Sequence, residues 1–314
     1  MSKYLVTGGA GFIGSHTVEA LVNAGHRVTV FDNFSTGTRA NLDSIDYRKI
    51  NVVVGDVLNW GDLVRAMDGV EYVIHLAAKV SVVDCENHPD VCSRVNVTGS
   101  LNVLRAAKHT AVKRVVLASS SAVYGDTGYD LQVESQLPHP CSVYAASKLA
   151  AEHYFEVFNS PELETVVLRY FNVYGPRQTA KSAYSAVIPL FISAMLSDNP
   201  IQIYGSGRQT RDFVYVEDVA LANILACESA VPGNVFNIGT EKPVSVCKLA
   251  IKINEIVGGK LDIEFLPGRQ GEILQSLCDA SKFRRGSNYI TTTDLIDGLT
   301  KTVEYMKKEK KHNE

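Results

Sequence analysis

Several features that would place the chain in a special class of protein are missing from its 314 residues. No apolar run approaches the roughly 20 residues that a helix needs to span a bilayer, and we expect no signal peptide before a first strand that begins almost at Met1. The net charge of −3 offers no broad basic surface to nucleic acid. The six cysteines form no Cys-x-x-Cys pair and no metal-ligand spacing, which indicates reduced thiols and no metal site. These absences predict a soluble, cytoplasmic protein with no membrane or nucleic-acid partner.

What the sequence does have is a glycine-rich turn at its start. The apolar run Tyr4–Val6 predicts a buried strand, and the periodicity of residues 12–24 predicts a helix. Between them, Gly8 permits a tight turn, Gly11 lets the backbone approach a pyrophosphate, and Gly14 lets the helix pack closely on the strand. The helix N-terminus offers free N–H groups and the positive end of its dipole to the same anion. The turn therefore predicts a dinucleotide site.

The second expected strand, residues 27–31, ends in Asp32, at about the 20-residue distance typical of a ligand for a ribose diol. Arg39 lies near enough in the sequence to meet a 2′-phosphate, but the carboxylate at the strand end would repel that group. The sequence therefore favours NAD over NADP. The further cofactor contacts that we expect come from the helix start, the polar loop after Asp32 and the ends of the next two strands: Phe12, Ile13, Asn33, Ser35, Thr36, Gly37, Asp56, Val57, Leu76, Ala77 and Ala78.

Strands and helices alternate through the first half of the chain. Further strands are expected at 52–54, 72–76, 115–117 and 165–169, and helices at 63–67, 89–109 and 142–158. This rhythm predicts an α/β fold with a doubly wound parallel sheet, in which right-handed crossovers bring every strand carboxyl end to one edge. The rhythm changes near residue 170. We therefore expect an NAD-binding Rossmann domain over 1–170, with returns near 212–240, and a smaller, discontinuous substrate-binding domain over 171–314.

A second group of residues suggests proton chemistry. Tyr144 and Lys148 stand four residues apart on an expected helix, so that their side chains share one face. A free phenol has a pKa near ~10, but a neighbouring ammonium and an oxidised nicotinamide would favour the phenolate. Ser119 and Ser120 end the strand before this helix, and a serine hydroxyl there could bridge the phenolate and a substrate hydroxyl. A Tyr-x-x-x-Lys pair alone is an ordinary helix pattern, and it gains meaning from the glycine turn and the serine run.

Together these motifs resemble the extended short-chain dehydrogenase/reductase family over nearly the whole chain, and within it the nucleotide-sugar 4-epimerases. The segments that carry the resemblance are Thr7–Gly14, His75–Ala78, Asn96–Ser100, Tyr144 with Lys148, Arg169–Arg177 and Arg211–Val214. The resemblance adds the following expected cofactor contacts: Asn96, Ser119, Tyr144, Lys148, Tyr170, Phe171 and Val173.

The resemblance also implies a mechanism. Tyr144 would be the base on the sugar 4-hydroxyl, Ser120 the hydrogen-bond bridge, and Lys148 the cation that lowers the phenol pKa and holds the nicotinamide ribose. Carbon 4 would be oxidised by NAD and reduced again from the other face. Relatives that are 4,6-dehydratases or UDP-glucuronate decarboxylases carry acids after the strand serine or threonine, whereas this chain has Ser121 and Ala122 there. That difference favours simple epimerisation.

Substrate contacts follow from the same matching. Those implied are Ser81, Ser121, Asn172, Gln178 and Ala186 around the sugar, Val187, Gln202 and Tyr204 at the base, Arg211 and Arg269 at the diphosphate, and Glu272 at a ribose hydroxyl. Either arginine could instead form a surface ion pair, and Tyr204 could be plain core packing. Ser276 matches a position where a small residue admits a 2-acetamido group and a bulky one excludes it, although it could also be an uninformative loop serine. Lys181 and Ser182 depart from the subgroup that favours N-acetylated sugars.

We therefore expect a UDP-sugar 4-epimerase that interconverts UDP-GlcNAc with UDP-GalNAc and UDP-glucose with UDP-galactose. One alternative is a UDP-glucuronate 4-epimerase, for which Lys79 or Arg94 would face the sugar carboxylate. Another is a non-catalytic nucleotide-binding regulator of the same fold. The resemblance also implies a homodimer through a four-helix bundle, built from the helices 91–109 and 142–158 of each copy.

Overall fold

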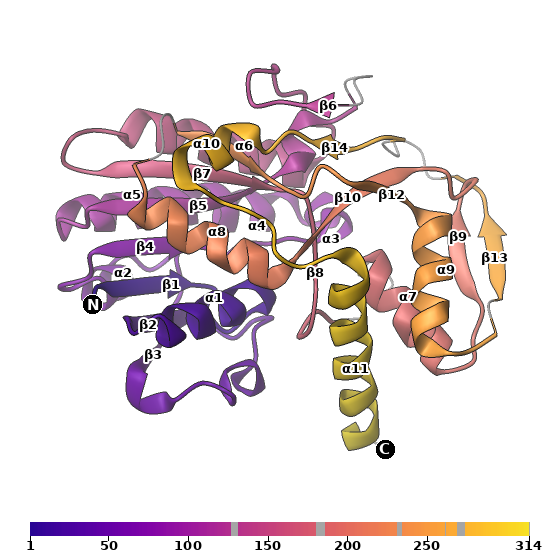
Figure 1. Cartoon of the computed structure of the whole chain (residues 1–314). Coiled ribbons are helices and arrows are strands. Elements are labelled where there is room, and N and C mark those ends of the chain that lie inside the picture. Colours follow the sequence, from indigo (N-terminus) through magenta and orange to yellow (C-terminus); the bar gives the residue numbers. More distant parts are fainter. Residues whose placement is uncertain (127–130, 180–185, 231–233, 261, 269–273, 314) are drawn as a thin grey trace.

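The computed structural model describes residues 1–126, 131–179, 186–230, 234–260, 262–268 and 274–313 (Figure 1). Its centre is a seven-stranded sheet in the order β11-β7-β5-β4-β1-β2-β3, in which every neighbouring pair is parallel. The strands are β1 (Lys3–Thr7), β2 (Arg27–Asp32), β3 (Ile50–Val54), β4 (Tyr72–His75), β5 (Arg114–Ser120), β7 (Glu164–Tyr170) and β11 (Val235–Ile238). The predicted α/β class with a doubly wound parallel sheet is confirmed.

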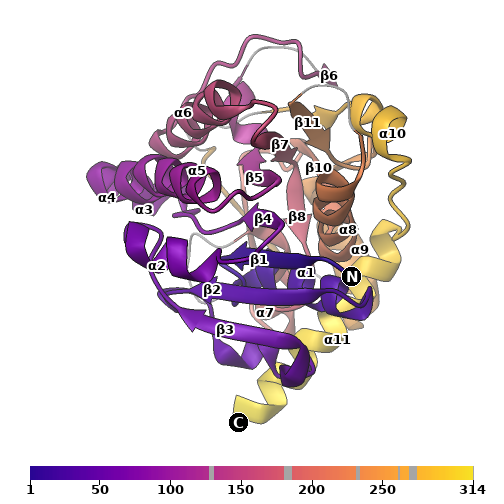
Figure 2. The same ribbon diagram turned by 90° about the vertical axis from the view of Figure 1, so that its left-hand side faces the viewer.

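Helices cover both faces of this sheet (Figure 2). On one face lie α1 (Phe12–Asn23), α8 (Val216–Glu228) and α10 (Ser281–Ser287), and on the other lie α2 (Trp60–Ala66), α5 (Gly99–His109) and α6 (Val143–Phe158). The division follows from the alternation of side chains along a strand, because Tyr4 and Val6 enter the first core and Leu5 enters the second. Short 3-10 turns occur at Arg39–Leu42, Tyr47–Lys49 and Ser121–Tyr124.

The single helix predicted over 89–109 is wrong in one respect. The structure has α3 (Val82–Asn87), α4 (Pro89–Ser93) and then a π-helical turn, Arg94–Thr98, before α5. The apolar positions of this segment keep a helical spacing, so periodicity alone does not reveal the wider turn. The turn contains Asn96, whose side chain leaves the helix and bonds to the loop after β4.

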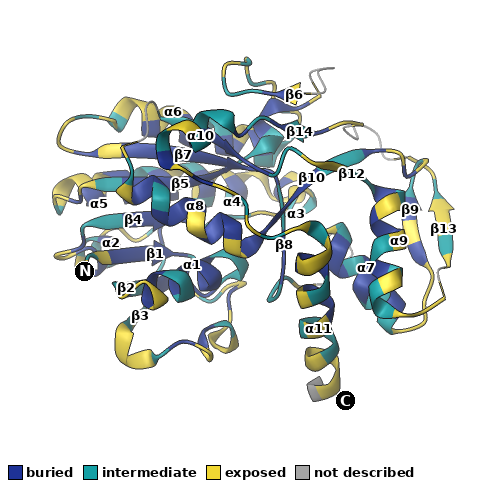
Figure 3. Cartoon of the chain, in the orientation of Figure 1, coloured by how far each residue is buried: buried dark blue, intermediate teal, exposed yellow. Residues whose placement is uncertain are grey.

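The second half of the chain, together with β6 from the segment between β5 and α6, adds a smaller layer beside the carboxyl edge of the sheet. It contains a three-stranded sheet of β8 (Asn172–Tyr174), β10 (Thr210–Tyr215) and β12 (Pro243–Ser245), and two pairs, β9 (Ile201–Tyr204) with β13 (Ile263–Leu266) and β6 (Leu131–Gln132) with β14 (Leu277–Cys278). The helices α7 (Val187–Leu196), α9 (Val246–Val257) and α11 (Leu295–Asn313) share one core. Figure 3 shows exposed residues on the outer faces of α9 and α11. After β10, the chain returns through α8 to β11 at the edge of the main sheet.

No helix among the described residues is long and apolar enough to cross a membrane.

Candidate active site

The turn between β1 and α1 forms a cradle of backbone. Gly11 caps α1 without a side-chain hydrogen bond, and the first turn contains no acidic residue, so its N–H groups stay open to an anion. Gly8 has a φ of +69°, and a Cβ there would lie 2.8 Å from the Ala77 backbone nitrogen. The glycines therefore bring the ends of β1 and β4 together beneath the helix N-terminus, as a pyrophosphate site requires.

We expect Gly14→Ala to be the most damaging change in this cradle. A Cβ at Gly14 would lie 2.0 Å from the Gly8 carbonyl oxygen and 2.8 Å from the Gly9 Cα, both of which are backbone atoms that cannot rotate away. Overpacking of this kind costs about 1–3 kcal/mol or more, and thermal unfolding would measure it. The matched control is Gly61→Ala within α2, where the nearest atom lies 3.4 Å away and the change is expected to stabilise. Equal melting temperatures for both variants would contradict the close-packing role.

Asp32 ends β2 in a position that suits a ribose. It is buried, and its two oxygens accept the backbone N–H groups of Ala10 at 2.9 Å and Phe34 at 2.8 Å. Each carboxylate oxygen keeps further acceptor capacity for a diol. In the loop after this strand, the exposed Asn33 donates to Asp56 at 3.1 Å, so two residues that are predicted to contact the cofactor are hydrogen-bonded to each other.

The segment after β4 is fixed by a directed chain of buried hydrogen bonds. The Ala77 N–H donates to Thr7 Oγ1, which lies 2.7 Å from His75 Nδ1, and His75 Nε2 lies 3.0 Å from Ser100 Oγ. Since Ser100 donates its own proton to the carbonyl of Asn96, His75 must donate through Nε2 and accept through Nδ1. Burial lowers the pKa of His75 to about 3, so this neutral tautomer persists at every physiological pH.

The same chain continues to the next helix. The side chain of Asn96 accepts from the Lys79 N–H at 2.8 Å and donates to Ser147 Oγ at 2.9 Å, and Ser147 donates to the Tyr144 carbonyl at 2.7 Å. The predicted cofactor segment and the predicted catalytic helix are thus joined through the π turn.

Tyr144, Lys148 and Ser120 are brought together at the carboxyl edge of the sheet. Tyr144 and Lys148 lie on α6, and the Lys148 Nζ stands 6.0 Å from the centre of the Tyr144 ring. Lys148 is buried and donates to the Ala118 carbonyl at 2.9 Å, and Ser120 hydrogen-bonds with Tyr144. The spacing in the sequence predicts this grouping, and the structure has it.

The electrostatics of the chain alone hold Tyr144 in its protonated form. Burial raises its pKa to about 12, with the Ser120 hydrogen bond acting in the opposite direction. Burial lowers the pKa of Lys148 to about 8, while the Cys92 thiol is the largest of the groups that oppose this change. The phenol therefore needs a further positive charge before it can act as a base at neutral pH.

Two predicted cofactor residues turn out to be core residues. Tyr170 is buried and donates to Asn223 Oδ1 at 2.5 Å, and Phe171 is buried beside Val123 and Tyr124. Their side chains are thus largely used for packing, and their contact with the cofactor stays a prediction. Val173 is partly buried.

The predicted substrate residues are spread over several elements. Asn172 lies on β8, partly buried, Ser121 begins the 3-10 turn after β5, and the Ser81 hydroxyl caps α3. Gln178 donates to the Val173 carbonyl. The others are placed on or beside β9, α7 and β10: Ala186 and Val187 at the start of α7, Gln202 and Tyr204 on β9, and Arg211 on β10. Gln202 is exposed and donates to Glu264. Arg269 and Glu272, with Lys181 and Ser182, lie outside the described residues.

Ser276 is nearly fully buried, and sequence reasoning missed its partner. Its Oγ donates to Oε1 of Gln132, which is also buried, at 3.2 Å. Gln132 lies on β6, and its carbonyl accepts the N–H of Asp279 and the amide of Asn237. Ser276 is thus fixed in place by a residue 144 positions earlier in the chain.

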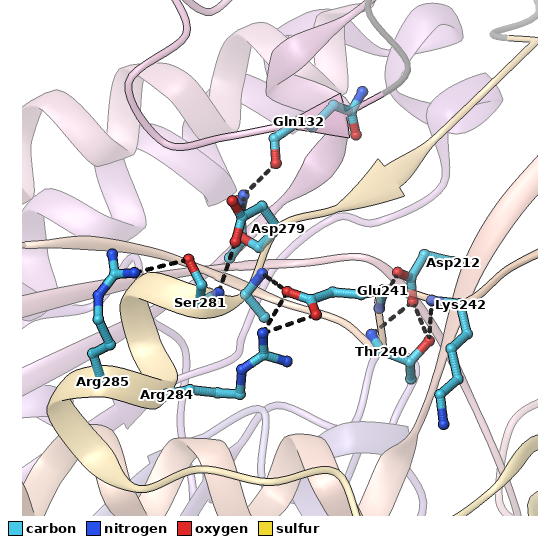
Figure 4. Close-up of polar contacts among 11 residues, drawn as sticks. Gln132, Asp212, Thr240, Glu241, Lys242, Asp279, Ser281, Arg284 and Arg285 are labelled. Carbon is cyan, nitrogen blue, oxygen red and sulfur yellow. Dashed lines mark hydrogen bonds and ion pairs between the residues drawn. The ribbon is translucent and has the colours of Figure 1, made fainter.

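A cluster of polar contacts surrounds Asp212 and Glu241 (Figure 4). Asp212 is fully buried and accepts from the Thr240 N–H, the Thr240 hydroxyl and the Glu241 N–H at 2.7–2.8 Å. Glu241 in turn accepts from the Ala280 N–H at 2.9 Å and from Arg284 at 2.8 Å. The loop after β11 therefore ties β10 to the start of α10. The only signal for this link in the sequence was the Arg211–Val214 motif.

A family model described as the NAD dependent epimerase/dehydratase family matches residues 4–239. The chain belongs to this family. The UDP-N-acetylglucosamine 4-epimerase from Methanobrevibacter ruminantium M1, in complex with UDP-N-acetylmuramic acid, is 38% identical with a TM-score of 0.91, over 98% of this chain and 99% of that one. The UDP-glucose 4-epimerase from Thermotoga maritima, with UDP-glucose, is 36% identical with a TM-score of 0.92, over the same shares. The UDP-glucuronic acid 4-epimerase from Bacillus cereus, with UDP-glucuronic acid and NAD, is 34% identical with a TM-score of 0.89, again over 98% and 99%.

As a member of the NAD-dependent epimerase/dehydratase family, the chain is an NAD-dependent enzyme of nucleotide-sugar metabolism. The predicted family and the predicted cofactor are confirmed. The cradle of Gly8, Gly11 and Gly14, the acceptor Asp32 and the fixed Ala77 backbone fit NAD, since they offer donors for its diphosphate and an acceptor for a ribose diol.

Proposed function

We propose that the chain is a UDP-sugar 4-epimerase that interconverts UDP-GlcNAc with UDP-GalNAc and UDP-glucose with UDP-galactose. NAD, when bound, supplies the redox chemistry at sugar carbon 4 and a positive charge near Tyr144. Tyr144 removes the proton of the 4-hydroxyl and returns it. Ser120 bridges the two oxygens, and Lys148 keeps a cation beside the phenol.

The observation that carries this proposal is the absence of an acidic side chain directly after Ser120. The grouped Ser120, Tyr144 and Lys148 suit proton transfer at one hydroxyl, and the 3-10 turn directly after β5 continues with Ser121 and Ala122. Neither side chain can exchange a proton with carbon 5 or 6, as dehydration or decarboxylation would need. The assembled groups therefore support epimerisation over the other reactions of the family.

The sugar range rests on Ser276. Its side chain is small and hydrogen-bonds with Gln132, which supports the proposal that the pocket has space for a 2-acetamido group. Likeness to both a UDP-GlcNAc and a UDP-glucose 4-epimerase supports activity on both pairs.

Proton NMR of the purified protein with each sugar nucleotide in turn tests the proposal. We expect the anomeric signals of the galacto products from both UDP-GlcNAc and UDP-glucose. Conversion of UDP-glucose alone would support the 4-epimerase reaction and contradict the proposal that Ser276 leaves space for a 2-acetamido group. Conversion of neither would make UDP-glucuronate the next substrate to test, and an NAD-containing protein that converts none of the three would leave a non-catalytic nucleotide-binding regulator as the remaining interpretation.

A UDP-glucuronate 4-epimerase is the second candidate. It is supported by likeness to the Bacillus cereus enzyme and by Lys79, a partly exposed cation in the loop after β4 whose Nζ lies 4.0 Å from Asp84. Arg94, in the π turn, is exposed. UDP-glucuronate is therefore the third substrate for the NMR test, and its exclusive conversion would establish this alternative.

We also propose that two copies pair through α5 and α6. These helices pack side by side at the outside of the molecule (Figure 2), and α6 exposes Tyr154 and Val157, the latter by 79%. A four-helix bundle would cover this apolar surface. Light scattering should give twice the monomer mass, and a monomer at micromolar concentration would contradict the pairing.

We further assign residues 1–170, with the returns near 212–240, to NAD binding and 171–314 to the sugar nucleotide.

A further inference from the structure

A buried ion pair lies behind the proposed catalytic groups and has no role in the reaction described above. Glu152 of α6 and Arg169 of β7 are 4% exposed each. Glu152 Oε2 accepts from Arg169 Nη2 at 2.6 Å, and Oε1 accepts from Arg169 Nε at 3.0 Å. The Ser119 hydroxyl of β5 donates to Oε1 at 2.5 Å. One carboxylate thus joins three elements of the fold.

Stability alone gives a weak reason for this arrangement. Removing two charges from water is costly, and replacing a buried pair with apolar side chains of similar size is often neutral or stabilising. The hydrogen bonding of the pair is also incomplete, because Arg169 Nη1 has no acceptor within hydrogen-bond geometry among the described residues, while the guanidinium carbon lies 4.8 Å from the centre of the Tyr124 ring. A buried polar group that is left partly unsatisfied suggests a role other than stability.

Glu152, Arg169 and Ser119 each lie next in the sequence or one helical turn from a group that we place in the reaction or the site. Glu152 follows Lys148 by one helical turn and Tyr144 by two, on the same face of α6. Ser119 precedes Ser120, and Arg169 precedes Tyr170, in a register that pairs Ser119 with Arg169 across the two strands. Any sliding of α6 along the strand ends would break the contacts of Glu152. We propose that Glu152 is a positioning residue of the epimerase reaction, which locks the helix of Tyr144 and Lys148 to the strand end that presents Ser120. The inference rests on the proposed function.

The charge of Glu152 has a second consequence for Lys148. The groups that face the Lys148 ammonium are Cys85 of α3, Cys92 of α4, His75 of β4, the Ala118 carbonyl of β5, and Tyr144 and Glu152 of α6. Burial lowers the pKa of His75 to about 3 and raises that of Cys85 to about 12, so neither group is charged at neutral pH, and Glu152 is the carboxylate of this set. Burial lowers the pKa of Lys148 to about 8, and Glu152, second to the Cys92 thiol, opposes that lowering. Without the carboxylate the ammonium is lost at a lower pH, and the rate should fall earlier as the pH rises.

The test is the double variant Glu152→Met/Arg169→Met, which removes both charges and keeps the volume. We expect it to fold, to retain NAD and to unfold at a temperature close to that of the wild type. We expect kcat on UDP-glucose to fall about 10²-fold, with KM changed less than about threefold, because misplacement of reacting groups lowers the rate more than binding. The alkaline limb of the kcat–pH profile should move to lower pH by less than in Glu152→Gln, because the double variant removes a positive charge together with the negative one. A folded double variant with wild-type kcat and pH profile would overturn the proposal.

Should the double variant fail to fold, Glu152→Gln provides the second measurement. Its amide still accepts from Ser119 but carries no charge, so a folded protein with an unshifted alkaline limb would also overturn the proposal. The matched control is Glu164→Gln, which removes the partner of Arg114 at the opposite ends of the same two strands. Arg114 keeps three carbonyl acceptors at the end of α8, and neither kcat nor the pH profile should change. Wild-type protein that converts no sugar nucleotide would instead refute the proposed function.

Discussion

Tyr144→Phe should lower kcat for UDP-glucose and UDP-GlcNAc by about 10³-fold while NAD remains bound. The change removes one hydroxyl from a half-buried ring, and with it the only group that we place at the sugar 4-hydroxyl as an acid and base. Positioned acid–base groups contribute about 10²–10⁴-fold to a rate. Lys148 keeps its bond to the Ala118 carbonyl, so the nicotinamide side of the site should persist. Anomeric proton signals would measure the rate, and the absorbance of NAD released on denaturation would measure occupancy.

The same helix supplies the control. Tyr154 lies on α6 with 38% of its surface exposed, on the outer face of the molecule. Tyr154→Phe removes the same hydroxyl from the same helix and should leave the rate unchanged. Full activity in Tyr144→Phe would remove the tyrosine from the role assigned to it. Loss of NAD together with activity would mean that the hydroxyl serves cofactor binding instead.

The sequence was most informative where function depends on local patterns. The glycine turn, Asp32 at the end of its strand and the Tyr144–Lys148 spacing each depend on contacts within a few residues or on one helix face, and periodicity makes such features readable. The parallel sheet followed from the alternation of strands and helices, since crossovers of that length leave few topologies.

The features that could not be read are long-range or depend on the register of hydrogen bonds. The π turn at Asn96 changes the bonding partner by one residue and leaves the apolar spacing intact. The contacts of Ser276 with Gln132, and of Glu241 with Arg284, join segments that are 144 and 43 residues apart. Glu152 looks in the sequence like an ordinary solvated helix position. Only the packed strand ends show that it is buried against Arg169.

Ser276→Tyr should turn the enzyme into one that prefers plain hexoses. Ser276 is buried and its hydroxyl already contacts the buried Gln132, so we expect a larger side chain to extend away from Gln132, into the space proposed for the sugar. There it would occupy the space proposed for the 2-acetamido group. A steric clash with one substrate changes the ratio of kcat/KM values without altering the reacting groups. We expect kcat/KM for UDP-GlcNAc to fall at least about 10²-fold, with that for UDP-glucose within about fivefold of the wild type.

Ser276→Ala separates the loss of the Gln132 hydrogen bond from the filling of space. It deletes the contact but adds no volume, so both substrates should remain within a few-fold of the wild type. Thermal unfolding and NAD content of both variants would show whether the site is still formed. If a folded, NAD-containing Ser276→Tyr protein converts the two substrates in the wild-type ratio, Ser276 does not line the sugar pocket. The N-acetyl specificity would then have to be sought at another wall of the site, with the proposed roles of Ser120, Tyr144 and Lys148 unaffected.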